Sequence, residues 1–436
     1  MDGLLSWGRY PRHLQRPHPV GWPADIAPAV VSATREGCGT LAYGMGRSYG
    51  DSCLAEGDEV VFTRAMDRVL SADWSTGVVR AQAGLTLDGL IRMALPRGWF
   101  LPVTPGTKFV TLGGALANDV HGKNHHVRGT FGRHVKRFGM FRSDRGFQEH
   151  VPGDGMFEAT VGGLGLTGVV LEVELQLRPV ASSLIEQRNI RFGHLDEFFA
   201  ISAEHDAAHE YAVAWIDCLA HGASTGRGHY TLGNHAEAGP LQPAEAGPRS
   251  MPIDPPFSLV NRASLQAFNS LYFHRQQVRE RRALVGYDPF FYPLDQLLHW
   301  NRMYGRAGFQ QYQCVVPRAD APAVVGAVLR AIARSGSGSF LAVLKQCGGA
   351  VSPGLLSFPM PGVSLALDFA QHAEANRRLF AHLDAMVHEA GGRLYPAKDA
   401  HMGAAHFQQA YPAWVEVERL RDPLLMSRFW KRVTSV

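Results

Sequence analysis

The sequence predicts an α+β fold of more than one domain, with an antiparallel sheet covered by helices in the middle of the chain. The 436 residues correspond to two or three domains of about 150 residues each. Short strand patterns separated by glycine-rich turns fill residues 29–180, whereas strand and helix patterns alternate after Pro179. With 46% apolar residues and a net charge of only +4, the chain is typical of globular proteins and gives no indication of nucleic-acid binding.

The N-terminal part of the chain is predicted to consist mainly of short strands. Residues 39–46, 59–66 and 77–84 each hold a short apolar run typical of a strand. A helix is predicted over 86–95, because four apolar residues recur there at helical spacing: Leu87, Leu90, Ile91 and Ala94. Strict alternation of apolar and polar residues over 169–178 predicts a long strand with one buried face.

The middle of the chain mixes strand and helix patterns, as expected for a sheet covered by helices. Strands are predicted over 183–192, 211–219, 312–318, 339–348 and 362–370, and helices over 195–208, 320–336 and 375–392. Residues 234–257 are rich in proline, glycine and alanine, so we expect no regular element there and a mobile loop or lid instead.

Several function classes are disfavoured by composition. The five cysteines show no C-x-x-C spacing, which predicts reduced thiols rather than a zinc site or a disulfide framework. No run of 18 apolar residues occurs, and the N-terminal segment has neither a basic leader nor an apolar core. We therefore expect a cytoplasmic location.

The first glycine-rich loop is YGMGRSYGD, residues 43–51. Its spacing is G-x-G-x-x-x-G, and the residues that follow predict a loop and a strand instead of a helix. This disfavours a dinucleotide-binding Rossmann domain. Successive backbone amides in such a loop can still surround an anion, although a tight turn alone also explains the glycines.

A second glycine-rich segment spans residues 104–135 and contains the run HGKNHH at 121–126. Its glycines allow a ligand to approach the backbone closely, and its polar side chains supply donors and titratable groups. Three clustered histidines make a metal site the obvious alternative. No established metal-ligand spacing is present, so we expect no metal and favour a planar cofactor. A third glycine turn, VGGLGLTG, spans 161–168.

These loops carry a family resemblance. The chain resembles FAD-dependent oxidases of the vanillyl-alcohol oxidase type, and among these it is most similar to the oxidases of polyprenylphosphoryl ribose. The motifs that carry the resemblance are, in chain order, GRSYGD, PGTKFVTLGGALANDVHGKNHH, ATVGGLGLTG, GFQQYQ, SFPMPG and GGRLYPAKD. The resemblance implies a PCMH-type fold of two domains. The FAD-binding domain would comprise residues 1–180 and 393–436, and the substrate-binding domain residues 181–392.

The resemblance also implies which residues bind FAD. The first loop would hold the pyrophosphate, the second segment would line the diphosphate, ribityl and ring portions, and single residues of two later strands would complete the site. The implied residues are Ala42, Tyr43, Gly44, Met45, Gly46, Arg47, Ser48, Tyr49, Gly50, Asp51, Ser52, Gly106, Thr111, Leu112, Gly113, Gly114, His121, Gly122, Lys123, Asn124, Val170 and Tyr395. Some relatives attach FAD covalently through a histidine in the first loop. Because residues 46–49 contain no histidine, we expect non-covalent FAD.

The candidate catalytic residues are Lys398, His121 and Tyr49. Oxidation of a secondary alcohol needs a base for the hydroxyl proton, and a buried lysine can have its pKa lowered toward neutrality. Only six of the 43 basic residues are lysines, so each lysine is informative. The resemblance points Gln311, Gln313, Lys345 and Lys398 toward the substrate. In place of a cysteine and an asparagine in mycobacterial members, this chain has Ala366 and Ser364.

The implied reaction is oxidation of the 2-hydroxyl group of a polyprenylphosphoryl-β-D-ribose, as the oxidising subunit of an epimerase that makes the arabinose form for the cell envelope. A separate NAD(P)H-dependent keto-reductase would be the partner, and a lipid-linked substrate makes peripheral association with the inner membrane an expectation. Two alternatives stay open at this point. One is an oxidase of a free sugar, alditol or aldonolactone on the same scaffold, and the other is a flavin-free binding protein.

Overall fold

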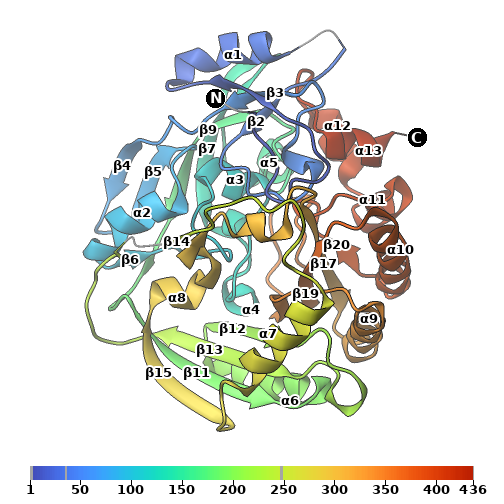
Figure 1. Ribbon diagram of the computed structural model, residues 1–436. Helices are drawn as coiled ribbons and strands as arrows, with labels where there is room; N and C mark the ends of the chain where they lie inside the picture. The colour runs from blue at the N-terminus through green and yellow to red at the C-terminus, as the bar shows by residue number, and fades with distance from the viewer. Residues whose placement is uncertain (1–2, 35–36, 246–248, 436) are drawn as a thin grey trace.

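Three sheets organise the computed structural model, which describes residues 3–34, 37–245 and 249–435. An eight-stranded antiparallel sheet has the order β15-β11-β13-β12-β18-β19-β17-β20, a five-stranded antiparallel sheet has the order β4-β5-β9-β7-β8, and a small parallel sheet has the order β1-β3-β2. Figure 1 shows the large sheet in the lower half of the molecule and the other two above and beside it. The predicted α+β class and the helix-covered antiparallel sheet are confirmed.

The strands of the two smaller sheets come from the N-terminal part of the chain. They are β1 (Arg16–Pro19), β2 (Leu41–Tyr43), β3 (Glu59–Phe62), β4 (Val69–Asp73), β5 (Val78–Gln82), β7 (Val135–Arg142), β8 (Gly146–His150) and β9 (Val169–Gln176). Strand β9 shows why its sequence folds this way, since Val169, Leu171, Val173 and Leu175 are all buried whereas the residues between Leu171 and Gln176 that alternate with them are partly exposed. A pair of short strands, β6 (Trp99–Phe100) and β10 (Arg178–Pro179), joins this part to the large sheet.

The large sheet is built from the middle of the chain and one later segment. Its strands are β11 (Leu184–Phe192), β12 (Tyr211–Ile216), β13 (Gly228–His235), β15 (Glu280–Gly286), β17 (Phe309–Pro317), β18 (Ala342–Cys347), β19 (Gly362–Ala370) and β20 (Arg393–Leu394). Strand β20 pairs with β17 through Leu394 and Cys314. Residues 393–394, which the expected division gives to the FAD-binding domain, thus extend the sheet of the other part.

Helices cover one face of the large sheet. Helices α6 (Leu195–His205), α9 (Ala321–Ser335) and α10 (Ala373–Glu389) pack against it on the same side (Figure 1). Helix α9 has proline in its first turn and ends at Gly336, whose φ of +68° suits a left-handed C-terminal cap. The opposite face of the sheet is covered only in part over its central strands: the short helix at His125–Arg128 contacts β18, and Tyr272 packs on Trp215 of β12. Other side chains on this face, such as Val213, Val343 and Ala366, line a site.

The remaining helices are short, apart from α7, and most lie near the smaller sheets and the C-terminal segment. They are α1 (Ile26–Ala33), α2 (Leu87–Ala94), α3 (Leu112–Ala117), α4 (His125–Arg128), α5 (Met156–Thr160), α7 (Arg262–His274), α8 (Tyr287–Phe291), α11 (Ala404–Ala410), α12 (Trp414–Leu420) and α13 (Arg428–Thr434). Thr86, which the sequence places inside the predicted helix, is instead the N-cap of α2 and accepts from the amide of Gly89. Of the helices in the described part of the chain, none is long and apolar enough to cross a membrane.

The proline-rich segment 234–257 is more ordered at its ends than the sequence suggests. Strand β13 continues to His235, and β14 (Arg249–Ser250) pairs with β16 (Leu297–Leu298). Between these strands, the carbonyl of Pro240 accepts from Ser183. Residues 246–248 of the predicted loop lie outside the described residues.

The C-terminal segment returns to the start of the chain. Helix α13 packs against the short helix at Asp51–Cys53, and Arg432 donates to Asp51 at 2.8 Å and to Asp399 at 2.9 Å. The amide of Tyr49 also donates to the carbonyl of Ala397. The first glycine loop and the segment around Lys398 are therefore held together, although they lie near opposite ends of the sequence.

Candidate functional site

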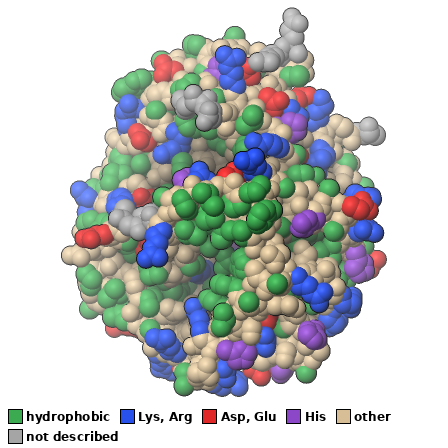
Figure 2. Space-filling view, in the orientation of Figure 1, with side chains coloured by type: hydrophobic (Ala, Val, Ile, Leu, Met, Phe, Trp, Pro, Cys, Tyr) green, Lys and Arg blue, Asp and Glu red, His purple; other side chains and the backbone are tan. Residues whose placement is uncertain are grey.

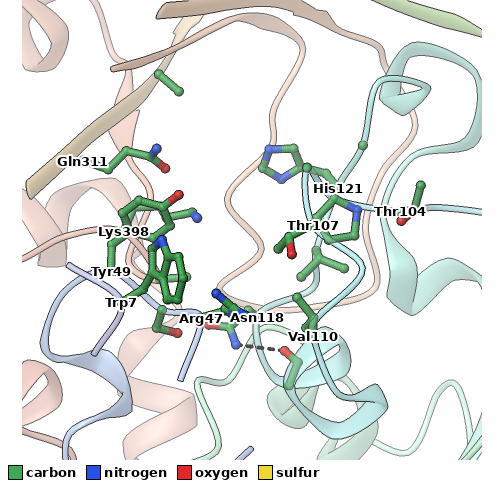
Figure 3. Close-up of a pocket in the computed structure, with 18 of the residues that line it drawn as sticks. Trp7, Arg47, Tyr49, Thr104, Thr107, Val110, Asn118, His121, Gln311 and Lys398 are labelled. Carbon is green, nitrogen blue, oxygen red and sulfur yellow. Dashed lines mark hydrogen bonds between the residues drawn. The ribbon is translucent and has the colours of Figure 1, made fainter. Parts of the chain in front are cut away.

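A cavity of about 650 Å³ lies where the small sheets, the large sheet and the C-terminal segment meet. This volume is within the usual range of about 300 to 1,000 Å³ for ligand pockets. Figure 3 shows two of its walls. Gln311, Lys398, Tyr49 and Trp7 lie on one side, and they face His121 across the cavity.

The first glycine loop forms the base of the cavity with its backbone. Among the described residues, the amides of residues 44–48 donate no hydrogen bond to another part of the protein. Gly46 has a φ of +59°, and a Cβ atom there would overlap the Tyr43 hydroxyl group, which donates to the carbonyl of Leu5 at 2.7 Å. A row of unsatisfied amides in a glycine loop is a site for an anionic group such as a diphosphate.

The second glycine segment packs closely on the first. Thr111 is the N-cap of α3 and accepts from the amide of Gly114. A Cβ atom on Gly44 would lie 2.6 Å from Thr111 Oγ1, so only glycine allows this approach of the two loops. The amides of Leu112 and Gly113 are already used, because they donate to the carbonyls of Leu85 and Ala83. The amides free to bind an anion are therefore those of the first loop.

One face of the large sheet supplies a third wall. A continuous row of side chains runs along it: successive members lie opposite each other in register on adjacent strands, except Val213 and Trp215, which share one face of β12. The row includes Asn189, Thr231, Val213, Trp215, Val343, Ala366 and Gln313. The cavity continues past this row to Tyr272 and Arg275 at the end of α7. It is consequently longer than a single planar ring requires.

Lys398 is positioned by the turn after β20. Its Nζ atom lies 3.6 Å from the centre of the Tyr49 ring and has no hydrogen-bond acceptor among the described residues. Burial lowers the pKa of Lys398 to about 7, although the nearby Asp368 acts in the opposite direction. The same burial raises the pKa of Asp368 to about 7, and Gln311 donates to its carboxyl oxygen at 2.6 Å. Lys398 can therefore exchange a proton near neutral pH.

His121 stands on the opposite side of the cavity. Its Nε2 atom lies 3.2 Å from Nε2 of Gln313, and its buried Nδ1 atom has no partner among the described residues. Burial, followed by the charge of Lys345, keeps the pKa of His121 well below its ordinary value. The imidazole is thus neutral and offers one nitrogen to a bound group.

The other two cavity lysines are already engaged. Lys345 Nζ donates to the carbonyl of Gly122 at 2.9 Å, and Lys123 Nζ donates to the carbonyl of Phe290. Burial lowers the pKa of both lysines, that of Lys123 to about 7. The bond from Lys345 holds the HGKNHH segment against the large sheet, and the bond from Lys123 holds it against α8. Lys398 is left as the cavity lysine available for chemistry.

Most of the residues expected at the site line this cavity. Every candidate catalytic and substrate residue is among its lining residues, and so are most of those expected to bind FAD. Four of the expected FAD-binding set do not line it: Gly50, Asp51, Leu112 and Asn124.

Each of these four has a packing role instead. Gly50 allows the backbone of Asp399 to approach, since a Cβ atom would lie 1.6 Å from its carbonyl oxygen. Asp51 binds Arg432, Leu112 is buried in the core beside the five-stranded sheet, and Asn124 donates to the carbonyl of Pro102. They support the cavity walls from behind.

The structure adds residues that sequence reasoning did not select. They are Trp7, Thr104, Thr107, Asn118, Asp295, Trp300 and Asp368. The guanidinium carbon of Arg47 lies 3.8 Å from the centre of the Trp7 ring, and Asp295 accepts from Thr107 at 2.8 Å. Asp368 could have been found from strand alternation, because it shares a face of β19 with Ser364 and Ala366.

The donor set fits FAD and offers no metal centre. In the described part of the chain, no group of three or more histidine, cysteine or acidic side chains is arranged to hold a metal ion. The free amides of the first loop suit a diphosphate. The open space beside Gly106 and the unpartnered Nδ1 of His121 leave room and a polar contact for a larger ring system.

Comparisons with known proteins agree with this fit. A family model described as an FAD binding domain matches residues 20–150. The chain is 36% identical over 440 residues to the decaprenylphosphoryl-beta-D-ribose oxidase of Mycolicibacterium smegmatis, and the match covers 96% of this chain and 94% of that protein. It is also 36% identical over 358 residues to an uncharacterized protein in the mprA 5' region of Streptomyces coelicolor, covering 77% of this chain and 95% of that one.

Proposed function

The chain belongs to the family of FAD-dependent oxidases that includes decaprenylphosphoryl-β-D-ribose oxidase, and from this we propose its reaction. The protein oxidises the 2-hydroxyl group of a polyprenylphosphoryl-β-D-ribose to the 2-keto sugar. This is the first half of an epimerisation to the arabinose form, and a separate NAD(P)H-dependent keto-reductase completes it. The enzyme acts in the cytoplasm, at the inner membrane surface where such a substrate lies.

The extent of the cavity is the observation that supports this substrate. Beyond Lys398 and His121, the cavity follows the face of the large sheet to Tyr272 and Arg275. A free pentose or lactone fills only the part next to the catalytic groups. The polar side chains of Gln187 and Asn189 and an arginine without an ion-pair partner in the described ranges suit a phosphodiester and the start of a prenyl tail.

Lys398 is the base in the proposed mechanism. With a pKa of about 7, a substantial fraction of its amino groups is neutral at physiological pH and can accept the proton of the 2-hydroxyl group. Asp368 and Gln311 orient the hydroxyl group and keep the proton near the base. Bound FAD supplies the oxidising power by accepting the two electrons released with the C–H hydrogen.

His121, Gln313 and Lys345 form the opposite wall in this proposal. The neutral His121 and the amide of Gln313 hold the sugar against the cofactor, so that the reacting carbon lies at a fixed distance. FAD is held without a covalent bond, because the loop at 46–49 offers no histidine for attachment.

The test is anaerobic reduction of the bound flavin, which is measured as the loss of its visible absorbance. We expect a polyprenylphosphoryl-β-D-ribose to bleach the flavin and the 2-keto sugar to appear in equal amount. Addition of a keto-reductase and NADH should then yield the arabinose form. Bleaching by free alditols or aldonolactones but not by the lipid phosphate would assign the chain to oxidases of free sugars. A protein that cannot be loaded with FAD would contradict both assignments.

A further inference from the structure

Large hydrophobic side chains are concentrated on the surface near α7. Of the sixteen such side chains exposed in the described ranges, seven lie between residues 253 and 284. Five belong to α7 and the loop before it, and we call them the apolar rim: Ile253, Phe257, Leu259, Phe268 and Leu271. Phe257 is 67% exposed and Leu271 75%. Contiguous exposed apolar side chains mark an interaction surface, whereas isolated ones do not.

The apolar rim borders the opening of the cavity. Phe268 stacks on Tyr272, with ring centres 5.6 Å apart, and Tyr272 lines the cavity. Leu259, in the loop before α7, is also held near the cavity: its amide donates to the carbonyl of Met303, three residues after the cavity-lining Trp300. Figure 2 shows hydrophobic side chains gathered on the face that carries α7, beside a hollow in the surface.

Positive charge accompanies this apolar surface. Residues 249–282 contain six arginines and two acidic residues, and both acids are neutralised, Asp254 by Arg9 at 2.7 Å and Glu280 by Arg188 at 2.7 Å. Arg262 and Arg275 stand at the two ends of α7. Neither has an ion-pair partner in the described part of the chain.

We propose that the apolar rim and these arginines dock on an anionic lipid bilayer, with the cavity opening toward the lipid. Apolar side chains enter the boundary between headgroups and acyl chains, and arginines at that depth bind lipid phosphates. A second copy of the chain fits less well, because pairing this surface with itself would place arginines against arginines. The proposal rests partly on the proposed function, since a docked cavity receives a lipid-linked sugar without extracting its tail from the membrane.

Vesicle binding by the FAD-loaded protein tests the proposal. We expect the protein to sediment with vesicles containing phosphatidylglycerol, to bind phosphatidylcholine vesicles more weakly, and to be released by high salt. Phe257→Glu and Leu271→Glu should each lower the bound fraction about fivefold or more. Phe147→Glu is the matched control, because Phe147 is 57% exposed on the distant strand β8, and it should bind like the original protein.

The outcomes separate docking from catalysis. Neither Phe257 nor Leu271 lines the cavity, so both variants should keep their FAD and reduce it normally with a soluble short-chain substrate. If a glutamate variant loses FAD, Arg262→Gln provides a milder test, and it should also lower the fraction of protein bound to vesicles.

Equal binding by Phe147→Glu and Phe257→Glu, or no binding to phosphatidylglycerol, would overturn the proposal. Oligomers that Leu271→Glu dissociates, without vesicle binding, would assign the surface to a second copy. Vesicle binding without oxidation of a lipid-phosphate pentose would leave docking intact and contradict the proposed substrate.

Discussion

Lys398 and Tyr49 come from opposite ends of the chain, and the ammonium nitrogen of Lys398 lies 3.6 Å from the centre of the Tyr49 ring. The contact is fixed by the backbone, because the amide of Tyr49 donates to the carbonyl of Ala397 at 3.0 Å. The aromatic ring stabilises the charged lysine, whereas burial favours its neutral form. The balance leaves a lysine that titrates near neutrality beside the cavity.

Removal of the lysine amine should stop the chemistry without releasing the cofactor. We expect Lys398→Met to lower the rate constant of flavin reduction about 10²- to 10⁴-fold, because a general base is lost. Stopped-flow absorbance under anaerobic conditions measures this rate. Lys136→Met, at an exposed lysine of β7, is the control and should react normally. A Lys398→Met variant with undiminished reduction would show that another group takes the proton.

The reduction rate should depend on pH through Lys398. Its amine is a base only when neutral, so the rate constant should rise as pH increases through about 7 and level off above it. Asp368→Asn removes a negative charge that raises the pKa of Lys398, and the midpoint of the profile should move to lower pH. Glu374→Gln, at an exposed carboxylate of α10, should leave the midpoint unchanged. An identical profile for Asp368→Asn would contradict the coupling.

FAD binding should require glycine at position 46 for two reasons: its positive φ and the lack of space for a Cβ atom. Gly46→Ala strains a residue at φ +59° and also displaces the Tyr43 hydroxyl group, so we expect FAD affinity to fall about tenfold or more. Gly155→Ala is the matched control, since Gly155 has a φ of +61° and no atom within 4 Å of a Cβ. Titration of the apoprotein with FAD measures both affinities. Equal affinities would remove the first loop from the cofactor site.

The flavin should be released by denaturation. Because no histidine occupies residues 46–49, acid precipitation should leave a colourless pellet and a yellow supernatant whose absorbance accounts for the bound flavin. A yellow pellet after repeated washing would instead indicate a covalent bond to another side chain.

Arg432 should contribute to stability through two buried acids. It binds Asp51 and Asp399, whose side chains are 5% and 1% exposed. Arg432→Met removes the arginine from both carboxylates and leaves Asp399 with His401 as its ion-pair partner, and we expect the free energy of unfolding to fall by about 2 to 3 kcal/mol. Urea denaturation followed by fluorescence measures this change. Arg419→Met, which removes a surface ion pair with Glu416, should leave the unfolding curve in place; an equal effect of both substitutions would refute a special role for Arg432.

The sequence patterns correctly predicted the helices and strands whose formation is determined by residues close together in the sequence. Strand β9 and helices α9 and α10 lie within the predicted segments or within a few residues of them, because burial of one face imposes a period that is visible in the sequence. Helix α7 was missed because its large apolar residues do not mark a buried face: Phe268 and Leu271 are exposed, and its buried residues are Leu265 and the polar Asn269. Strand β15 was also missed, because as an edge strand it has little buried surface.

The candidate site was predictable where motifs are continuous in the chain. The glycine loops and LYPAKD lie at the cavity as expected, whereas Trp7 and Asp295 reach it only through the tertiary fold and leave no local signal. Asn124 shows the opposite error: it lies inside HGKNHH, yet its side chain points to Pro102. Membership in a motif does not determine which way a side chain points.

The return of the chain to its first loop has a consequence for biosynthesis. Tyr395, Ala397 and Lys398 form part of the cavity wall, and α13 packs against the short helix that ends the first loop. A nascent polypeptide on the ribosome therefore lacks a complete flavin pocket until translation has passed these residues. Cofactor incorporation should follow synthesis of α13, and products terminated before these residues should accumulate as colourless apoprotein.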